Sequence, residues 1–224
     1  MQRHFVQELE MLKTNLVKMA SFAEQAIADS IAALLERRKD IAEQVIARDK
    51  RINSLEIQID DAVVDLLALQ QPVATDLRFI LAALKINNDL ERIGDHAVNI
   101  AESALQCAKL PSGTPLTNIP EMAEITKKML RDAIDGFIHS NAGLGRAVLK
   151  GDDTIDDLNK KIVNDLVAVI RNEPNSIDEA LDLIRVSRNL ERVADLATNI
   201  AEEVIFMAEA RVVKHHVEES PLSQ

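Results

Sequence analysis

Two stretches of the sequence carry acidic and amide side chains at regular spacing. The first stretch holds Asn88, Glu91, Asp95, Asn99 and Glu102, and the second holds Glu191, Asp195, Asn199 and Glu202. Steps of three and four residues place such side chains on one face of an α-helix. Carboxylate and amide oxygens are the ligands that hard cations such as Mg²⁺, Mn²⁺, Ca²⁺ or an iron ion prefer. The pattern therefore predicts metal binding on two helices.

A solvated helix face is the alternative interpretation of these two acidic stripes, because helix exteriors are polar by default. An ordinary exposed face mixes Lys with Glu at four-residue spacing, whereas both stripes carry one sign of charge. Glu91 and Asp95, like Glu191 and Asp195, stand one turn apart and repel each other. A bound cation would compensate that repulsion, so the metal interpretation is favoured.

A further acidic strip precedes the first stripe. Asn53, Glu56 and Asp60 follow one another at steps of three and four. If this helix packs beside the first stripe, the two helices together complete one metal site. The second half of the chain has Asn159 and Val163 at the positions of Glu56 and Asp60, so its site has fewer ligands or uses Asp156 differently.

Two arginines and the absence of enzyme motifs bear on function. Arg92 and Arg192 stand three residues before Asp95 and Asp195, which predicts local ion pairs, with a phosphate contact as the alternative. The chain has no phosphate-cradling glycine loop, nucleophile elbow or zinc signature. A carboxylate-bridged di-iron oxidase expects Glu-x-x-His, and no glutamate here has a histidine three residues later. The sequence therefore predicts no catalytic centre.

Long helices must position these side chains. Apolar residues recur at steps of three and four, which predicts helices over about 4–37 and 40–70 and a third that Thr75 caps. Residues 110–120 contain three prolines and one glycine, and after them the pattern repeats. Shifting 86–104 by 100 gives nine identities in nineteen positions. We expect an all-α fold of two tandem three-helix bundles (six long helices), related by a pseudo-twofold axis and without β-sheet. The predicted parts are 1–110, a linker 111–118, 119–215 and a tail 216–224.

Composition narrows the functional classes. The chain has 26 Lys and Arg against 37 Asp and Glu, a net charge of −11 that disfavours nucleic-acid binding. Its only aromatic residues are five Phe, which excludes an aromatic stacking platform. The single cysteine, Cys107, fits a reducing compartment and a buried position. No window is long and apolar enough for a membrane span or a secretion signal, so a cytoplasmic location is expected.

Specific motifs resemble the PhoU family of phosphate-uptake regulators. They are Asp89-Leu-Glu-Arg-Ile-Gly-Asp95, its echo Asn189-Leu-Glu-Arg-Val-Ala-Asp195, the segment 71–78 and the segment 199–203. The resemblance covers about residues 5–215. It implies two three-helix bundles and metal ions (Fe, Mn, Mg or Zn) on motifs of an acid, three residues, then Asp: Glu91 to Asp95, Glu191 to Asp195 and Glu56 to Asp60.

The same resemblance implies a function and partners. The family is a homodimeric, cytoplasmic, non-enzymatic accessory of the phosphate ABC transporter, where it acts on the ATPase subunit. It also signals to a phosphate-sensing histidine kinase and represses the phosphate-starvation response. A metal-free helical scaffold that binds partners through its helix faces remains the alternative.

Overall fold

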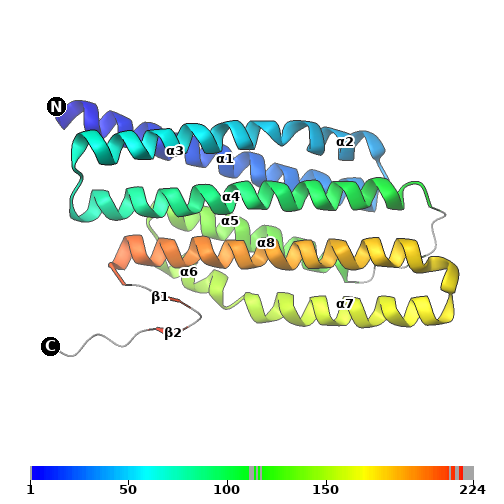
Figure 1. Ribbon diagram of the computed structural model, residues 1–224. Helices are drawn as coiled ribbons and strands as arrows, with labels where there is room; N and C mark the ends of the chain where they lie inside the picture. The colour runs from blue at the N-terminus through cyan, green and yellow to red at the C-terminus, as the bar shows by residue number, and fades with distance from the viewer. Residues whose placement is uncertain are drawn as a thin grey trace.

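The computed structural model describes residues 2–110, 114, 116, 118–211, 213–214 and 217–218. It contains α1 (Gln2–Leu35), α2 (Lys39–Arg48), α3 (Lys50–Gln70), α4 (Ala74–Cys107), α5 (Ile119–His139), α6 (Ala142–Leu149), α7 (Asp152–Asn172), η1 (Pro174–Ser176), α8 (Ile177–Glu209), β1 (Val213–Lys214) and β2 (Val217–Glu218). The long helices lie side by side in two layers, with α3, α4, α8 and α7 in front and α1 and α5 behind (Figure 1). The all-α prediction of two three-helix bundles is confirmed.

The middle helix of each bundle is divided, which corrects the prediction of one helix over 40–70. Asp49 separates α2 from α3, yet it keeps helical dihedral angles, φ −53° and ψ −38°. Its carbonyl accepts from the N–H groups of Ile52 and Asn53 at 2.8 and 3.2 Å, so it begins the new helix. In the second bundle, Lys150 and Gly151 separate α6 from α7.

The turn between α3 and α4 is partly as expected. Gln71, with φ 47°, ends α3 directly before Pro72. The predicted capping role of Thr75 is wrong, because α4 already begins at Ala74 and Val73 takes the N-cap position without a side-chain bond. Thr75 therefore lies inside the first turn, where its hydroxyl accepts a hydrogen bond from Arg78 at 3.3 Å.

The centre of the molecule is the pair α4 and α8, which run antiparallel and join the two bundles (Figure 1). Their apolar faces are buried around Ile86, Leu90, Val186 and Leu190. Burial of apolar side chains makes the main favourable contribution to the free energy of folding. The core is thus continuous from one repeat to the other, and acidic side chains at its edge lie between repeats.

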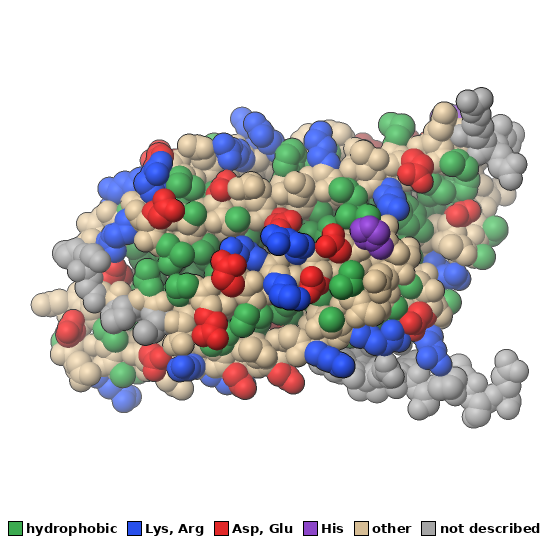
Figure 2. Space-filling view, turned by 180° about the vertical axis from the view of Figure 1, so that it is seen from behind, with side chains coloured by type: hydrophobic (Ala, Val, Ile, Leu, Met, Phe, Trp, Pro, Cys, Tyr) green, Lys and Arg blue, Asp and Glu red, His purple; other side chains and the backbone are tan. Residues whose placement is uncertain are grey.

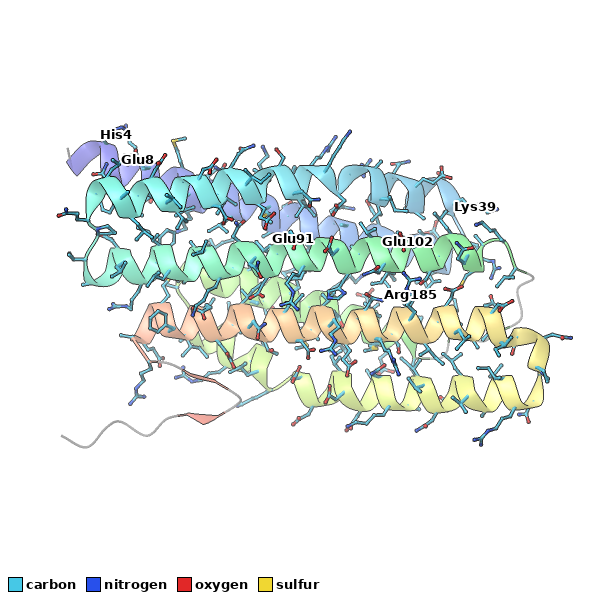
Figure 3. The ribbon with its side chains drawn as sticks, viewed as in Figure 1. His4, Glu8, Lys39, Glu91, Glu102 and Arg185 are labelled. Atoms are coloured by element: carbon cyan, nitrogen blue, oxygen red, sulfur yellow. The ribbon has the colours of Figure 1, made fainter. Side chains whose placement is uncertain are left out.

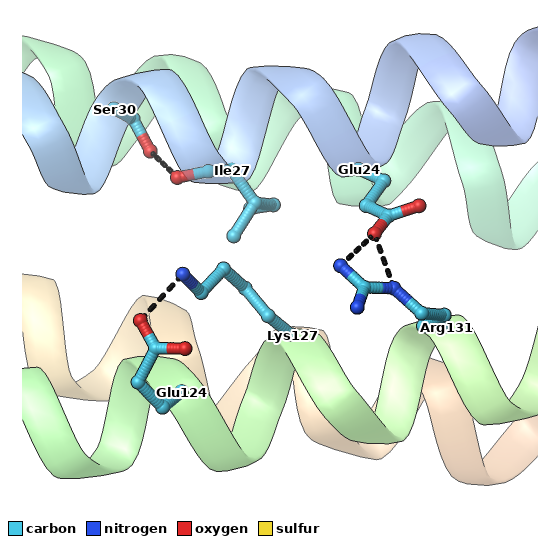
Figure 4. Close-up of polar contacts among 6 residues, drawn as sticks. All are labelled: Glu24, Ile27, Ser30, Glu124, Lys127 and Arg131. Atoms are coloured by element: carbon cyan, nitrogen blue, oxygen red, sulfur yellow. Dashed lines mark hydrogen bonds and ion pairs between the residues drawn. The ribbon is translucent and has the colours of Figure 1, made fainter.

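A charged pair joins the two repeats on the other face. Acidic and basic side chains alternate along the middle of the back face (Figure 2). There Arg131 of α5 donates to Glu24 of α1 at 2.8 and 2.7 Å, while Lys127 pairs with Glu124 along α5 (Figure 4).

A further tie lies where α1 ends. Arg37 donates to Glu179 of α8 at 2.9 Å and to the carbonyl groups of Cys107 and Leu110. The Arg37 guanidinium therefore links the ends of α1 and α4, in the first bundle, to α8 in the second bundle.

The C-terminal tail contradicts the expectation that the chain lacks β-structure. Val213 and Lys214 pair antiparallel with Glu218 and Val217. This two-residue ladder lies beyond the end of α8, outside both bundles. Positions 111–113, 115 and 117 of the predicted linker, and most of the predicted tail, lie outside the described residues. Within the described part, no helix combines the length and apolarity that crossing a membrane requires.

Candidate functional site

The first candidate centre lies where α3 packs beside α4. Asn53 and Glu56 come from α3, Asp49 directly precedes it, and Glu91 and Asp95 come from α4. Figure 3 places Glu91 on the stretch of α4 that runs beside α3. Burial raises the pKa of Glu91, and the nearby carboxylates of Asp95, Glu56 and Asp49 raise it further. The structure therefore brings together two helices whose acids the sequence predicted to meet.

Two oxygens in this group are buried and have no hydrogen-bond partner. Asn53 donates from its amide to Asp49 Oδ2 at 2.9 Å, which leaves Asp49 Oδ1 and Asn53 Oδ1 unsatisfied. Burial also raises the pKa of Asp49 above its ordinary value. Buried oxygens without a donor are costly unless a cation or a water supplies the missing interaction. Asp49 is thus a candidate site residue that the sequence reasoning missed, although its spacing to Asn53 equals that of Glu91 to Asp95.

Gly94 allows this close approach of the helices. A Cβ at position 94 would stand 2.9 Å from Ile52 Cδ1 and 3.3 Å from Asp49 Oδ1. The same region borders a cavity of about 150 Å³ that Asp49, Gly94 and Ile52 line together with Phe22 and other residues of the first bundle. The second repeat has a buried alanine, Ala194, at the equivalent position.

Asp60 does not join Asp49 and Glu91. Its carboxylate accepts a hydrogen bond from the amide of Asn87 at 2.8 Å, and the same amide donates to the Glu56 carbonyl at 3.0 Å. Asp60 lines a second cavity, of about 420 Å³, whose remaining walls include side chains of α8. The cavity is bordered by Glu56, Asp60, Leu84, Lys85, Asn88, Asp89, Asn199, Glu202 and Glu203.

The second cavity therefore combines acids of both repeats, an arrangement that treating each repeat as a separate bundle could not predict. Its most buried acid is Asp89, which is 8% exposed. Burial raises the pKa of Asp89 to about 6, against the opposing effects of Arg92 and a hydrogen bond from Asn199.

A cation from the opposite helix neutralises part of the first acidic stripe, which corrects the picture of a one-signed face. Arg185 of α8 pairs with Glu102 of α4 at 3.0 Å and lies 3.5 Å from Asn99 Oδ1. Lys85 of α4 pairs with Glu203 of α8 at 2.6 Å. Figure 3 labels Glu102 and Arg185 on the two neighbouring helices. Asn99 thus lies beside the ion pair of Arg185 with Glu102.

The second repeat is arranged differently. The predicted ion pair of Arg192 with Asp195 is confirmed at 3.2 Å, but Arg92 lies 3.9 Å from Asp89 and makes no pair with Asp95. Burial raises the pKa of Asp195, Arg192 opposes that effect, and Asp156 raises the pKa further. Glu191 is partly exposed on the same helix.

His96 crosses between the repeats, which the sequence did not indicate. Its Nδ1 lies 2.8 Å from Asn189 Oδ1, and Asn189 donates its amide to the Arg185 carbonyl at 2.7 Å. Because the Asn189 oxygen accepts, the His96 Nδ1 carries the proton in this arrangement.

The donor chemistry of the first centre fits a hard cation, since all its candidate atoms are oxygens. In the part of the chain that the structure describes, no group of three His, Cys, Asp or Glu side chains is arranged so that it could hold one metal ion. Metal ligation by any of these residues therefore stays a prediction.

The fold and the site together define a two-repeat helical-bundle protein with acidic side chains held between its helices. The chain matches the PhoU domain over residues 16–104 and 119–204, and it belongs to the PhoU family.

Individual relatives cover nearly the whole chain. The "Phosphate-specific transport system accessory protein PhoU homolog" of Aquifex aeolicus is 40% identical over 95% of this chain and 96% of its own. The protein of the same description from Pseudomonas putida is 37% identical over 95% and 84%. The crystal structure of PhoU from Pseudomonas aeruginosa matches with a TM-score of 0.90 and 34% identity over 92% of this chain and 99% of that one.

Proposed function

We propose that this chain is a non-enzymatic accessory of phosphate transport that restrains phosphate uptake and represses the phosphate-starvation response. It acts in the cytoplasm, as a homodimer, on the ATPase subunit of a phosphate ABC transporter and on a phosphate-sensing histidine kinase. The observation that carries the proposal is the similarity over both repeats to relatives described as phosphate-specific transport system accessory proteins. The described bundles offer helix faces and acidic clusters, which suit partner binding.

A cellular experiment tests this regulatory role. Cells that lack their own PhoU family protein should express a phosphate-starvation reporter even in phosphate-rich medium, and this chain should restore repression. We expect repression to depend on phosphate supply. Full reporter expression in the presence of the folded chain would contradict the proposal.

We further propose that the first repeat holds hard metal ions. The supporting observations are the two unsatisfied buried oxygens of Asp49 and Asn53 and the raised pKa of Glu91 among its acidic neighbours. Asp49, Asn53, Glu56, Glu91 and Asp95 would hold the ion. A bound cation would add positive charge beside these carboxylates, where Arg92 already acts to lower the pKa of Glu91. The all-oxygen set favours Mg²⁺, Mn²⁺ or iron over Zn²⁺.

The second repeat should bind metal less well. Arg192 already pairs with Asp195, whereas the described residues include no ion pair to Asp95. We therefore expect Asp95→Asn to remove more metal than Asp195→Asn, measured by elemental analysis of protein purified from metal-containing buffer. Helix content should be unchanged, because Asn is nearly isosteric with Asp.

Thermal melting separates a metal site from a merely crowded acidic face. A metal that binds only the folded state stabilises it, so Asp95→Asn should lower the melting temperature in metal-containing buffer. If the acids only repel each other, the same change should raise it slightly. Equal metal content in the wild type and both variants would refute the site.

A metal-free scaffold remains the second candidate. The observation that favours it is the pairing of Lys85 with Glu203 and of Arg185 with Glu102, by which the chain compensates part of its own acidic charge. Restored repression by an Asp95→Asn, Asp195→Asn variant that holds no metal would favour this candidate.

A further inference from the structure

The outer face of α3 carries exposed apolar side chains in a row. Ile57 and Val64 are 61% and 62% exposed, and Ala68 is exposed one turn further. Asp61 stands between them at helical spacing. We call Ile57, Asp61, Val64 and Ala68 the α3 stripe.

The α3 stripe lies opposite the side of the helix that packs in the core. The core side of α3 is formed by Ile52, Leu55, Ile59, Val63 and Leu66. At 100° per residue, these side chains centre about 180° from the stripe, so α3 is apolar on two opposite sides. A helix with two apolar sides is normally covered by other elements or by a partner on both of those sides. In Figure 1, α3 is an outer helix, and no described element covers its far side.

The second repeat shows that the fold does not require this face. Adding 103 to the residue numbers of the α3 stripe gives its counterparts on α7, which are Lys160, Asn164, Val167 and Arg171. Three of the four are polar, on a helix with the same place in its bundle and at the opposite edge of the front layer (Figure 1). The apolar row of α3 therefore serves something other than the fold.

Charge around the stripe indicates what covers it. Apart from the exposed Lys50 and Arg51 at its first turn, α3 carries no Lys or Arg. Residues 52–77 contain five acids, which are Glu56, Asp60, Asp61, Asp65 and Asp76. Asp61 and Asp65 are exposed beside the apolar row. A second copy of this face would oppose acid to acid, and an anionic lipid surface would be repelled. A segment with apolar residues flanked by Lys or Arg complements both features.

We propose that the α3 stripe docks a basic amphipathic helix of a partner protein. Leucine-like side chains of that helix cover Ile57, Val64 and Ala68, and its cations face Asp61 and Asp65. Such docking uses the recognition mode in which a helix lays its apolar side onto a complementary surface. The inference rests on the proposed function only in supposing a protein partner, and it is independent of metal.

A designed helical peptide tests the docking surface directly. The probe is a fluorescently labelled helix of Leu and Lys with Leu at steps of three and four, titrated with the full chain by anisotropy. A peptide with Glu in place of Lys is the charge control. We expect saturable binding of the Lys peptide that weakens as salt is added, and little binding of the Glu peptide. Equal binding of both peptides, or binding of neither, would overturn the proposal.

The second repeat supplies a variant that should fold. Ile57→Lys combined with Ala68→Arg places on α3 the residues that α7 carries at the equivalent positions. This variant should weaken binding of the Lys peptide at least about tenfold, because central apolar contacts carry most interface energy. Leu181→Lys is the matched control, since Leu181 is 53% exposed but lies on α8; it should bind like the wild type. An unchanged affinity of the α3 variant would overturn the proposal.

Two other occupants are distinguishable by the same variant. If the stripe binds a second copy of the chain, sedimentation should show a dimer that the α3 variant no longer forms. If the stripe binds a membrane, the wild type should bind vesicles of phosphatidylglycerol and the α3 variant should not. Either result overturns the proposal. The metal content and the reporter phenotype are separate readouts, so peptide binding without repression would count against the proposed function and leave the docking surface intact.

Discussion

Replacement of Asp89 by Asn should stabilise the folded chain at neutral pH. Asp89 is 8% exposed between α4 and α8, where burial raises its pKa from 3.8 to about 6. Lys85 and Arg92 on α4 and Asn199 and Glu203 on α8 act on the carboxyl group. The second repeat already has Asn at the equivalent position 189. An Asn can still accept the hydrogen bond from Asn199, so the substitution removes the charge and keeps the contact.

The sign and size follow from the raised pKa. The stability that protonated Asp89 contributes is fully present below the unfolded pKa of 3.8 and is lost as the pH rises through about 6. A difference of about two pKa units corresponds to about 3 kcal/mol of unfolding free energy. We therefore expect Asp89→Asn to gain about 2 kcal/mol at pH 8 and close to nothing at pH 4. The melting temperature at pH 8 should rise by about 5 °C.

Urea denaturation followed by circular dichroism at pH 4, 6 and 8, in the presence of a chelator, measures this effect. The control is Asp153→Asn, because Asp153 is exposed on α7; its unfolding free energy should differ little from that of the wild type at each pH. A variant at position 89 that is no more stable than the wild type at pH 8, or equally stabilised at pH 4, would refute the reasoning.

Two other substitutions probe the helix contacts that hold the site. Gly94→Ala should destabilise the fold by about 1–3 kcal/mol, because its methyl group would meet Ile52 at 2.9 Å; thermal melting measures this, with the exposed Ser54→Ala as the control on the neighbouring helix. Arg37→Met should cost about 2–3 kcal/mol, since the carboxylate of Glu179 has a side chain only 8% exposed and would lose its cation. Adding Glu179→Gln should recover part of that loss in denaturant titrations, and purely additive effects would contradict the pairing.

Periodicity and the internal repeat predicted most of the fold because they report local geometry. Apolar residues at steps of three and four specify helices, and a repeat shift of 100 specifies two similar bundles. The break at Asp49 was not predictable in this way, since its backbone stays helical and no Pro or Gly marks it. The short β-pairing after α8 was missed for a different reason: two residues per strand are too few to show an alternating pattern.

The site was only partly predictable because its members meet across helices. Glu56, Glu91 and Asp95 lie on one pair of neighbouring helices, as expected if those helices pack together, and Asp49 joins them. Pairing of the stripe acid Glu102 with Arg185, and of Glu203 with Lys85, depends on the antiparallel packing of α4 against α8. Spacing along one helix carries no information about which residues of the next helix lie opposite. The pattern therefore could not predict these ion pairs.

The two repeats act as controls for each other, because they build the same bundle from different residues. A position that keeps its residue in both copies, such as Glu91 with Glu191, is compatible with a shared role in either bundle. A position that differs is not required by the architecture that the two copies share. Asp89 against Asn189 places a costly buried carboxyl group in only one copy, and Ile57 against Lys160 places an exposed apolar side chain in only one. Both departures weaken the folded chain or its solubility, and both lie on the first repeat. The first repeat should therefore carry the specific contacts, while the second supplies the architecture that completes the shared core.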